Sequence, residues 1–199
     1  ADRVMKSVTS WLERKLFLKV SAEKTKVVRP TKSTFLGFTF WGSKDGWKCK
    51  PAQDRKKKLY AKIRKWLRRK NAVARPLNVT FTKLNQIIRG WINYFRIGSM
   101  KGLLEKFSQW MRHKVRVVIL KQWKKPRTIY RNLMKLNKYT HANLSDESIF
   151  KVANSRLGWY RRGGGDVINY LLSPKVLAIA QKDRPGLVDP LAYYLSRMQ

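Results

Sequence analysis

The acidic residues come first as candidate catalysts, because two-metal polymerases and nucleases need carboxylates that bracket two divalent ions. The 199 residues include 11 Asp plus Glu, which are scattered and form no Asp-Asp pair. The one adjacent pair, Asp146 and Glu147, follows Ser145, and this triplet is typical of a helix N-cap with acids in its first turn. We therefore expect no catalytic residue in the chain.

The histidines, the cysteine and the glycine run suggest no metal or cofactor chemistry either. His113 and His141 have no Cys or Glu at ligand spacing, so we expect packed or solvated roles and no metal site. Cys49 is the only cysteine, which excludes an internal disulfide and a Cys-rich zinc site and favours a reducing compartment. Gly163 to Gly165 lacks the spacing of a phosphate-binding loop, and we interpret it as a hinge.

The strongest chemical signal is positive charge. Lys and Arg number 46, the formal net charge is +35, and Glu105 is the only acid between Asp54 and Asp146. Each phosphate that Lys or Arg neutralises releases condensed counterions, so the composition predicts a polyphosphate partner. An anionic membrane surface or an acidic protein is the competing partner, using the same basic helices.

Charged side chains need elements to hold them, and the first 50 residues predict a small α/β part. Apolar residues at helical spacing predict a helix from about Asp2 to Leu16. Strands are expected over 17–20, 26–29 and 35–41, the last closing a hairpin through Asp45-Gly46 onto 47–50. Such a part buries too little to be stable alone and needs a larger sheet to dock on.

From Pro51 onward the pattern becomes helical, which makes the expected fold class α+β, with a mainly helical bundle after the small α/β part. Helices are predicted over 52–70, from Thr80 or Thr82 to about Arg96, over 100–125, near 128–136 and from Ser145 to about 156. Gly90 stands inside the second helix, and its cost of about 1 kcal/mol against Ala suggests close helix packing or close approach of a backbone there.

Helix faces rich in Lys and Arg can hold a nucleic-acid backbone without reading bases. The first helix after Pro51 carries one basic cluster near its end, and the third helix carries another. The candidate contacts are Arg64, Lys65, Arg68 and Arg69, followed by Arg112, Lys114, Arg116 and Lys121.

Two groups of motifs resemble a known family. Leu84-Asn85, Arg89-Gly90-Trp91 and Asn93-Tyr94-Phe95-Arg96 resemble the signature of the maturase-specific domain, or thumb, of group II intron reverse transcriptases. Upstream, residues 23–28 and 35–40 look like the last blocks of the reverse-transcriptase palm. The resemblance adds Arg89, Tyr94 and Arg96 as nucleic-acid contacts and implies a primer-grip-like role for Phe35, Leu36, Gly37 and Phe38.

The resemblance also implies a domain plan. Residues 1–50 correspond to the end of the palm, 51–136 to the thumb, and 137–199 to a DNA-binding region in which Gly158-Trp159-Tyr160 and Gly186-Leu187 carry the similarity. The Tyr-x-Asp-Asp aspartates of such enzymes would precede Asp2, so polymerase activity and its Mg²⁺ are implied for the parent enzyme only. The chain begins with Ala1, and we expect it to be a piece of a longer protein.

The leading hypothesis is a nucleic-acid-binding part of a group II intron reverse transcriptase and maturase, intracellular in a bacterium or an organelle. Its implied partners are the intron RNA, the RNA template with its DNA primer, target DNA, and the remaining palm and fingers. The alternative is one part of a split reverse transcriptase, completed by a chain that carries the aspartates. No run of about 18 apolar residues is present, so no membrane span is expected.

Overall fold

The computed structural model describes residues 1–181 and 184–198, in two units of residues 1–52 and 53–199. In the first unit, helix α1 (Asp2–Leu16) has the predicted bounds. It has no buried residue, and Phe17 ends it in the left-handed conformation with φ 53°. The strand predicted over 17–20 is wrong, because this reversal of the backbone is incompatible with extended pairing.

The predicted hairpin is confirmed as part of a three-stranded antiparallel sheet of order β1-β2-β3. Strand β1 (Thr34–Phe35) pairs with β2 (Phe38–Ser43), which pairs with β3 (Gly46–Pro51). The strand predicted over 26–29 is absent; a 3-10 turn (Pro30–Lys32) follows that segment, as the fixed φ of Pro30 allows.

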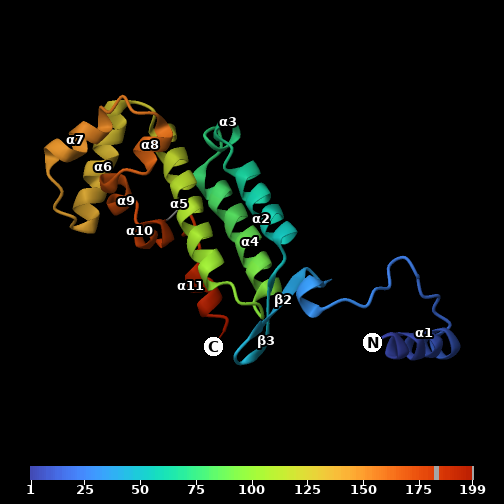
Figure 1. Cartoon of the computed structure of the whole chain (residues 1–199). Helices are drawn as coiled ribbons and strands as arrows, with labels where there is room; N and C mark the ends of the chain where they lie inside the picture. The colour runs from blue at the N-terminus through green and yellow to red at the C-terminus, as the bar shows by residue number, and fades with distance from the viewer. Residues whose placement is uncertain (182–183, 199) are drawn as a thin grey trace. The chain divides into compact units, whose positions relative to one another are not determined.

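The second unit is helical, which confirms the α+β class (Figure 1). Its helices are α2 (Gln53–Trp66), α3 (Arg69–Ala72), α4 (Leu77–Phe95), α5 (Lys101–Trp123), α6 (Pro126–Thr140), α7 (Asp146–Ala153), α8 (Trp159–Gly163), α9 (Asp166–Leu171), α10 (Pro174–Ala178) and α11 (Pro190–Leu195).

The core of this unit lies among α2, α4, α5 and α11. Helix α2 packs on α4, and the ring of Tyr60 on α2 meets Phe107 and Trp110 of α5 at 5.2 and 4.8 Å between centroids. Helix α11 packs against both α4 and α5. Helix α5 is the central element, because residues 115–120 are all buried.

The helix ends follow local chemistry. Helix α4 starts at Leu77 and not at a Thr cap; Thr80 is buried and its hydroxyl donates to the Pro76 carbonyl at 3.3 Å. The predicted N-cap of α7 is confirmed, since Ser145 Oγ accepts from the Ser148 N–H. Pro126 opens α6 as expected, and the helix runs four residues beyond the predicted end.

Two glycines differ in what surrounds them. A Cβ at Gly163 would lie 2.7 Å from Val117 Cγ2, so the absence of a side chain lets α8 pack closely on α5. The glycine run ends α8 and precedes α9, and its role as a hinge stays a prediction. Gly90 was expected to lie in close packing, yet a Cβ there meets nothing within 4 Å. The close approach therefore occurs at 163, and Gly90 faces open space.

The C-terminal segment folds back onto α4 and is held there by Asn85 and Tyr194. The side chain of Asn85 donates to the Gly186 carbonyl at 2.7 Å and accepts from the Val188 N–H at 2.9 Å. Just beyond the other end of α4, the hydroxyl of Tyr194 donates a hydrogen bond to the Gly98 carbonyl at 2.9 Å. Residues 186–194 thus form part of the same packed unit as the helices before them.

Candidate nucleic-acid interface

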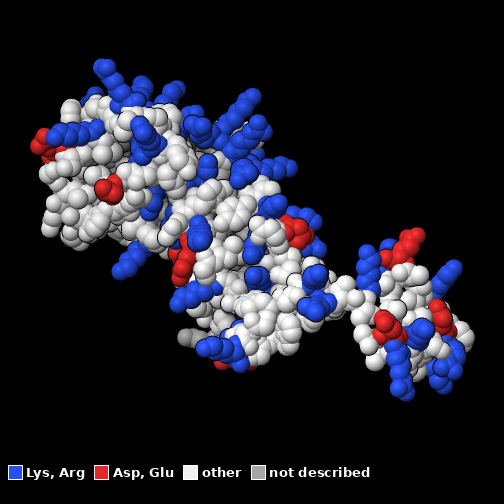
Figure 2. All heavy atoms as spheres, viewed as in Figure 1, with Lys and Arg blue, Asp and Glu red and all other residues white. Residues whose placement is uncertain are grey.

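The corner between α2 and α3 carries the densest of the predicted contacts. Arg64 and Lys65 lie in the last turn of α2, Arg68 precedes α3 and Arg69 begins it, and all four are exposed. No carboxylate among the described residues lies within ion-pair distance of any of them. We call these four residues the α2–α3 corner; blue side chains project over this part of the unit in Figure 2.

Helix α5 fixes the backbone that follows this corner. The amide of Gln122 donates to the carbonyls of Ala72 and Arg75 at 3.2 and 2.7 Å, and it also approaches the Val73 carbonyl. The guanidinium of Arg75 stacks 4.6 Å from the ring centroid of Trp66 at the end of α2. The corner is therefore attached to a rigid support, while its charged ends remain in solvent.

Helix α4 adds the three candidates taken from the motif. Arg89 and Arg96 are exposed, and Tyr94 is 57% exposed. The Arg89 guanidinium lies 5.8 Å from the ring centroid of Tyr193 on α11, so this cation stands at the junction of α4 with the C-terminal segment. These three side chains are accessible to a ligand from solvent.

The α5 candidates lie in different surroundings, because the segments after residue 158 cover that helix. Arg112 forms an ion pair with Asp189 at 2.9 Å and keeps 16% of its side chain exposed. Lys114 lies 5.0 Å from the Tyr160 ring centroid, and Lys121 is half-buried.

Arg116 is the most enclosed of the predicted contacts, at 8% exposure. Its guanidinium donates to the Leu172 carbonyl at 2.9 Å and to the side chain and carbonyl of Asn169. Burial, with a smaller effect of Arg112, lowers its pKa to about 10. Because each of its three guanidinium nitrogens already donates a hydrogen bond to residue 169 or 172, Arg116 links α5 to α9 and is omitted from the interface proposed below.

Sequence reasoning missed a basic stripe on α6. Arg127, Arg131, Lys135 and Lys138 follow one another at spacings of four, four and three, so they share one helix face, and all are exposed. They line a shallow groove of about 790 Å³ together with Tyr130. The helical spacing of the four cations was the signal that could have revealed this stripe.

The primer-grip-like residues form the tight turn between β1 and β2. Leu36 and Gly37 both have positive φ, 48° and 82°, as a two-residue type I′ hairpin requires. Phe35 pairs with Phe38 across the turn, and Phe35 and Leu36 are both more than 60% exposed. The turn therefore presents an exposed apolar tip, which residues that contact a ligand would require.

No group of three or more His, Cys, Asp or Glu that could hold a metal ion gathers among the residues that the structure describes. His113 is packed: its ring lies 4.1 Å from that of Tyr160. Among the helices described, none is long and apolar enough to span a membrane.

Comparison with known proteins gives one finding. Residues 56–139 match the family model of the group II intron maturase-specific domain. No curated protein matches the chain. The matched residues run from the first turns of α2 almost to the end of α6, and they include the α2–α3 corner, the α4 motif and the α6 stripe. The match confirms the resemblance found in the motifs: residues 56–139 are similar to the maturase-specific domain of group II introns.

Proposed function

We propose that this chain is the part of a group II intron maturase that grips the intron RNA for splicing. One observation carries the proposal: the α2–α3 corner, whose four exposed cations have no described carboxylate partner, lies inside the maturase-specific domain. Cations held rigidly beside a backbone of phosphates bind it through charge and counterion release. Exposed Arg89 and Arg96 on α4 extend the same kind of contact.

In the parent enzyme the same basic face would hold the duplex of RNA template and DNA primer, with the β1–β2 turn near the primer end. The exposed Phe35 and Leu36 support this role. Target DNA is a further partner of the basic surface. Contacts to the phosphate backbone do not depend on the base sequence, so the same surface can bind intron RNA, the template-primer duplex and target DNA in turn.

The test is binding of a group II intron RNA and of an unrelated structured RNA of equal length across a salt series. We expect affinity to fall steeply with salt for both RNAs and to be higher for the intron RNA at every salt concentration. Binding that ignores salt would contradict an electrostatic grip. Equal binding of both RNAs would assign intron specificity to another part of the maturase.

A second function is favoured by the first unit. Val4, Val8 and Trp11 of α1 are each at least 50% exposed, so the helix presents an exposed apolar face. We propose that the remaining palm of a reverse transcriptase, carrying the catalytic aspartates, covers this face. Such a palm is either the preceding part of the same protein or a separate chain of a split enzyme.

Coexpression with a palm fragment tests this second function. Amide exchange of residues 2–16 should slow on complex formation, and the complex should show primer extension that neither part shows alone. Unchanged exchange in α1 with the palm fragment present would contradict it.

A further inference from the structure

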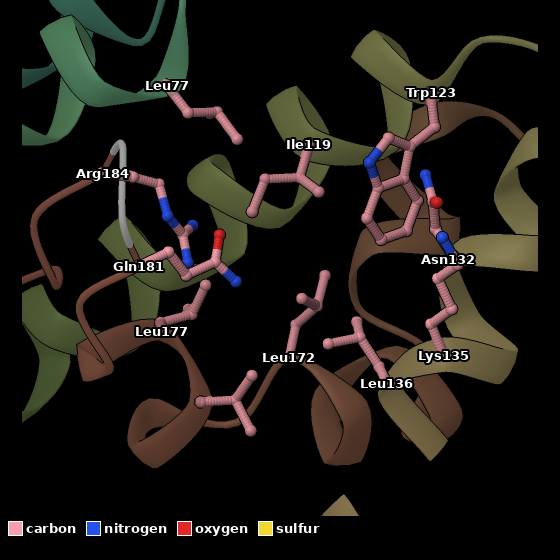
Figure 3. Close-up of a pocket in the computed structure, with 11 residues that line it drawn as sticks. Leu77, Ile119, Trp123, Asn132, Lys135, Leu136, Leu172, Leu177, Gln181 and Arg184 are labelled. Carbon is pink, nitrogen blue, oxygen red and sulfur yellow. The ribbon is translucent and has the colours of Figure 1, made fainter. Parts of the chain in front are cut away.

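A cavity of about 280 Å³ lies between α5, α6 and α10, with α4 at one side (Figure 3). Its walls are mainly aliphatic, from Leu77, Ile119 and Leu172 among others, and the indole of Trp123 forms part of one side. Polar side chains stand at two ends: Asn132 beside Trp123, and Gln181 beside Arg184. An apolar slot with a few convergent polar groups is the usual form of a small-molecule site.

One donor in this cavity has no partner among the described residues. Arg184 Nε is buried and makes no hydrogen bond to them, while the guanidinium lies 4.7 Å from the ring centroid of Phe81. Burial also lowers the pKa of Arg184, which reflects the cost of holding its charge in apolar surroundings. A buried donor without an acceptor favours a ligand that brings one, such as a ring carbonyl oxygen.

The cavity opens beside the basic stripe of α6. Lys135 belongs to both: it lines the cavity with Asn132, and it is the third cation of the stripe after Arg127 and Arg131. A chain of phosphates lying along the stripe would therefore pass the mouth of the cavity. A ligand would fit both places if its phosphates lay along the stripe and a flat, apolar ring carrying acceptor atoms entered the cavity.

We infer that this cavity takes one unpaired nucleobase of an RNA strand whose phosphates lie along the α6 stripe. The base lies between the aliphatic wall and the indole of Trp123, since stacking on an aromatic ring suits any base. The amides of Gln181 and Asn132 and the guanidinium of Arg184 face the polar edges of the base, the part that splayed-out bases present to proteins.

This inference rests on the proposed RNA binding and gives it a second element, separate from the α2–α3 corner. The corner would hold a backbone by charge alone, whereas the cavity would recognise a nucleotide that is not paired. The two sites are therefore distinguishable by ligand: one responds to any polyphosphate, the other to the presence of a base.

The probes are uridine and adenosine 5′-monophosphates, with ribose 5-phosphate as the ligand that has the same charge and no base. The indole N–H resonance of Trp123, assigned with a Trp123→Phe protein, is followed by NMR in the full chain. We expect the nucleotides to shift this resonance in a saturable manner and ribose 5-phosphate to leave it in place. An unmoved resonance, or an equal shift with ribose 5-phosphate, would overturn the inference.

Two matched substitutions locate the site. Gln181→Ala should weaken nucleotide binding at least about fivefold, because one hydrogen bond to the base is lost. Gln86→Ala removes an exposed glutamine of α4 outside the cavity and should change nothing. Equal affinities in the two variants would also overturn the inference.

Intron RNA binding is measured with the same proteins. If the wild-type protein binds intron RNA while its Trp123 resonance does not respond to nucleotides, the cavity inference fails and the proposed function stands. If intron RNA does not bind at all, the proposed function fails independently of the cavity.

Discussion

Gly90 is a glycine that the fold does not require. It lies exposed inside α4, and a Cβ at this position would meet nothing within 4 Å. We predict that Gly90→Ala raises the free energy of unfolding by about 1 kcal/mol, because Ala loses less backbone entropy in a helix. Urea denaturation measures the change.

Gly163→Ala is the control for this prediction. It should destabilise the protein, because its Cβ would lie 2.7 Å from Val117 Cγ2 and 3.3 Å from the Val117 backbone nitrogen. If both substitutions changed the free energy of unfolding in the same direction, the conclusion that Gly90 faces open space and Gly163 is closely packed would be contradicted.

His113 makes stability depend on pH. Burial lowers its pKa below 6.5, reinforced by Lys114 and Arg116 and partly opposed by a hydrogen bond to the Tyr160 backbone. The unfolded state therefore binds a proton before the folded state does, and stability is lost as pH falls from about 6.5 through the folded-state pKa. We predict that His113→Gln flattens the decline in unfolding free energy between pH 7.5 and 5.

Carboxylates titrate in both proteins, so the difference between the two pH profiles isolates His113. If the unfolding free energy of the wild type changed with pH as little as that of His113→Gln, the histidine would have the same pKa in the folded and unfolded states. A steeper profile in the variant would reverse the sign and contradict the packed environment.

At the scale of elements, Asn85 joins α4 to the C-terminal segment. Its side chain satisfies both the Gly186 carbonyl and the Val188 N–H, so Asn85→Ala leaves two backbone groups without their partner. We predict a loss of about 2 kcal/mol in the free energy of unfolding and faster amide exchange over residues 186–194.

Asn93→Ala is the matched control at the same helix. Asn93 is exposed and accepts one hydrogen bond, from the hydroxyl of Tyr193 at 3.0 Å. Its loss should change stability by less than about 0.5 kcal/mol. Similar exchange rates in the two variants would argue against Asn85 as the residue that holds the segment.

The sequence predicted the elements better than their contacts. Apolar spacing located α1 and the helices after Pro51, and Asp45-Gly46 located the β2–β3 turn. Helical pattern alone could not show that residues after 158 return over α5, because that packing joins distant positions such as Arg116 and Leu172, which are 56 residues apart. Arg116 was therefore expected on an exposed helix face and is instead buried among carbonyls.

The candidate interface divides in the same way. The α2–α3 corner could be found from local charge because nothing in the described unit folds over it. The cavity beside Trp123 could not, since Gln181 and Arg184 come from a segment with no helical or strand pattern. Residues that act through local exposure were predictable, and those assembled by long-range packing were not.

For the whole molecule, the central claim is that the α2–α3 corner holds intron RNA by charge. The direct measurement compares the salt dependence of intron RNA binding in three proteins: wild type, the corner variant and a control. The corner variant carries Arg64→Gln, Lys65→Gln, Arg68→Gln and Arg69→Gln. The control removes four exposed cations of α1, with Arg3→Gln, Lys6→Gln, Arg14→Gln and Lys15→Gln.

All three proteins should fold alike, because the substituted side chains are exposed. We predict that the corner variant binds more weakly and that its plot of log affinity against log salt is shallower by about 3.6, since each of the four lost phosphate contacts removes about 0.9 from the slope. The control should keep most of the wild-type slope. A corner variant with the wild-type slope, or a control that loses as much as the corner variant, would contradict the account.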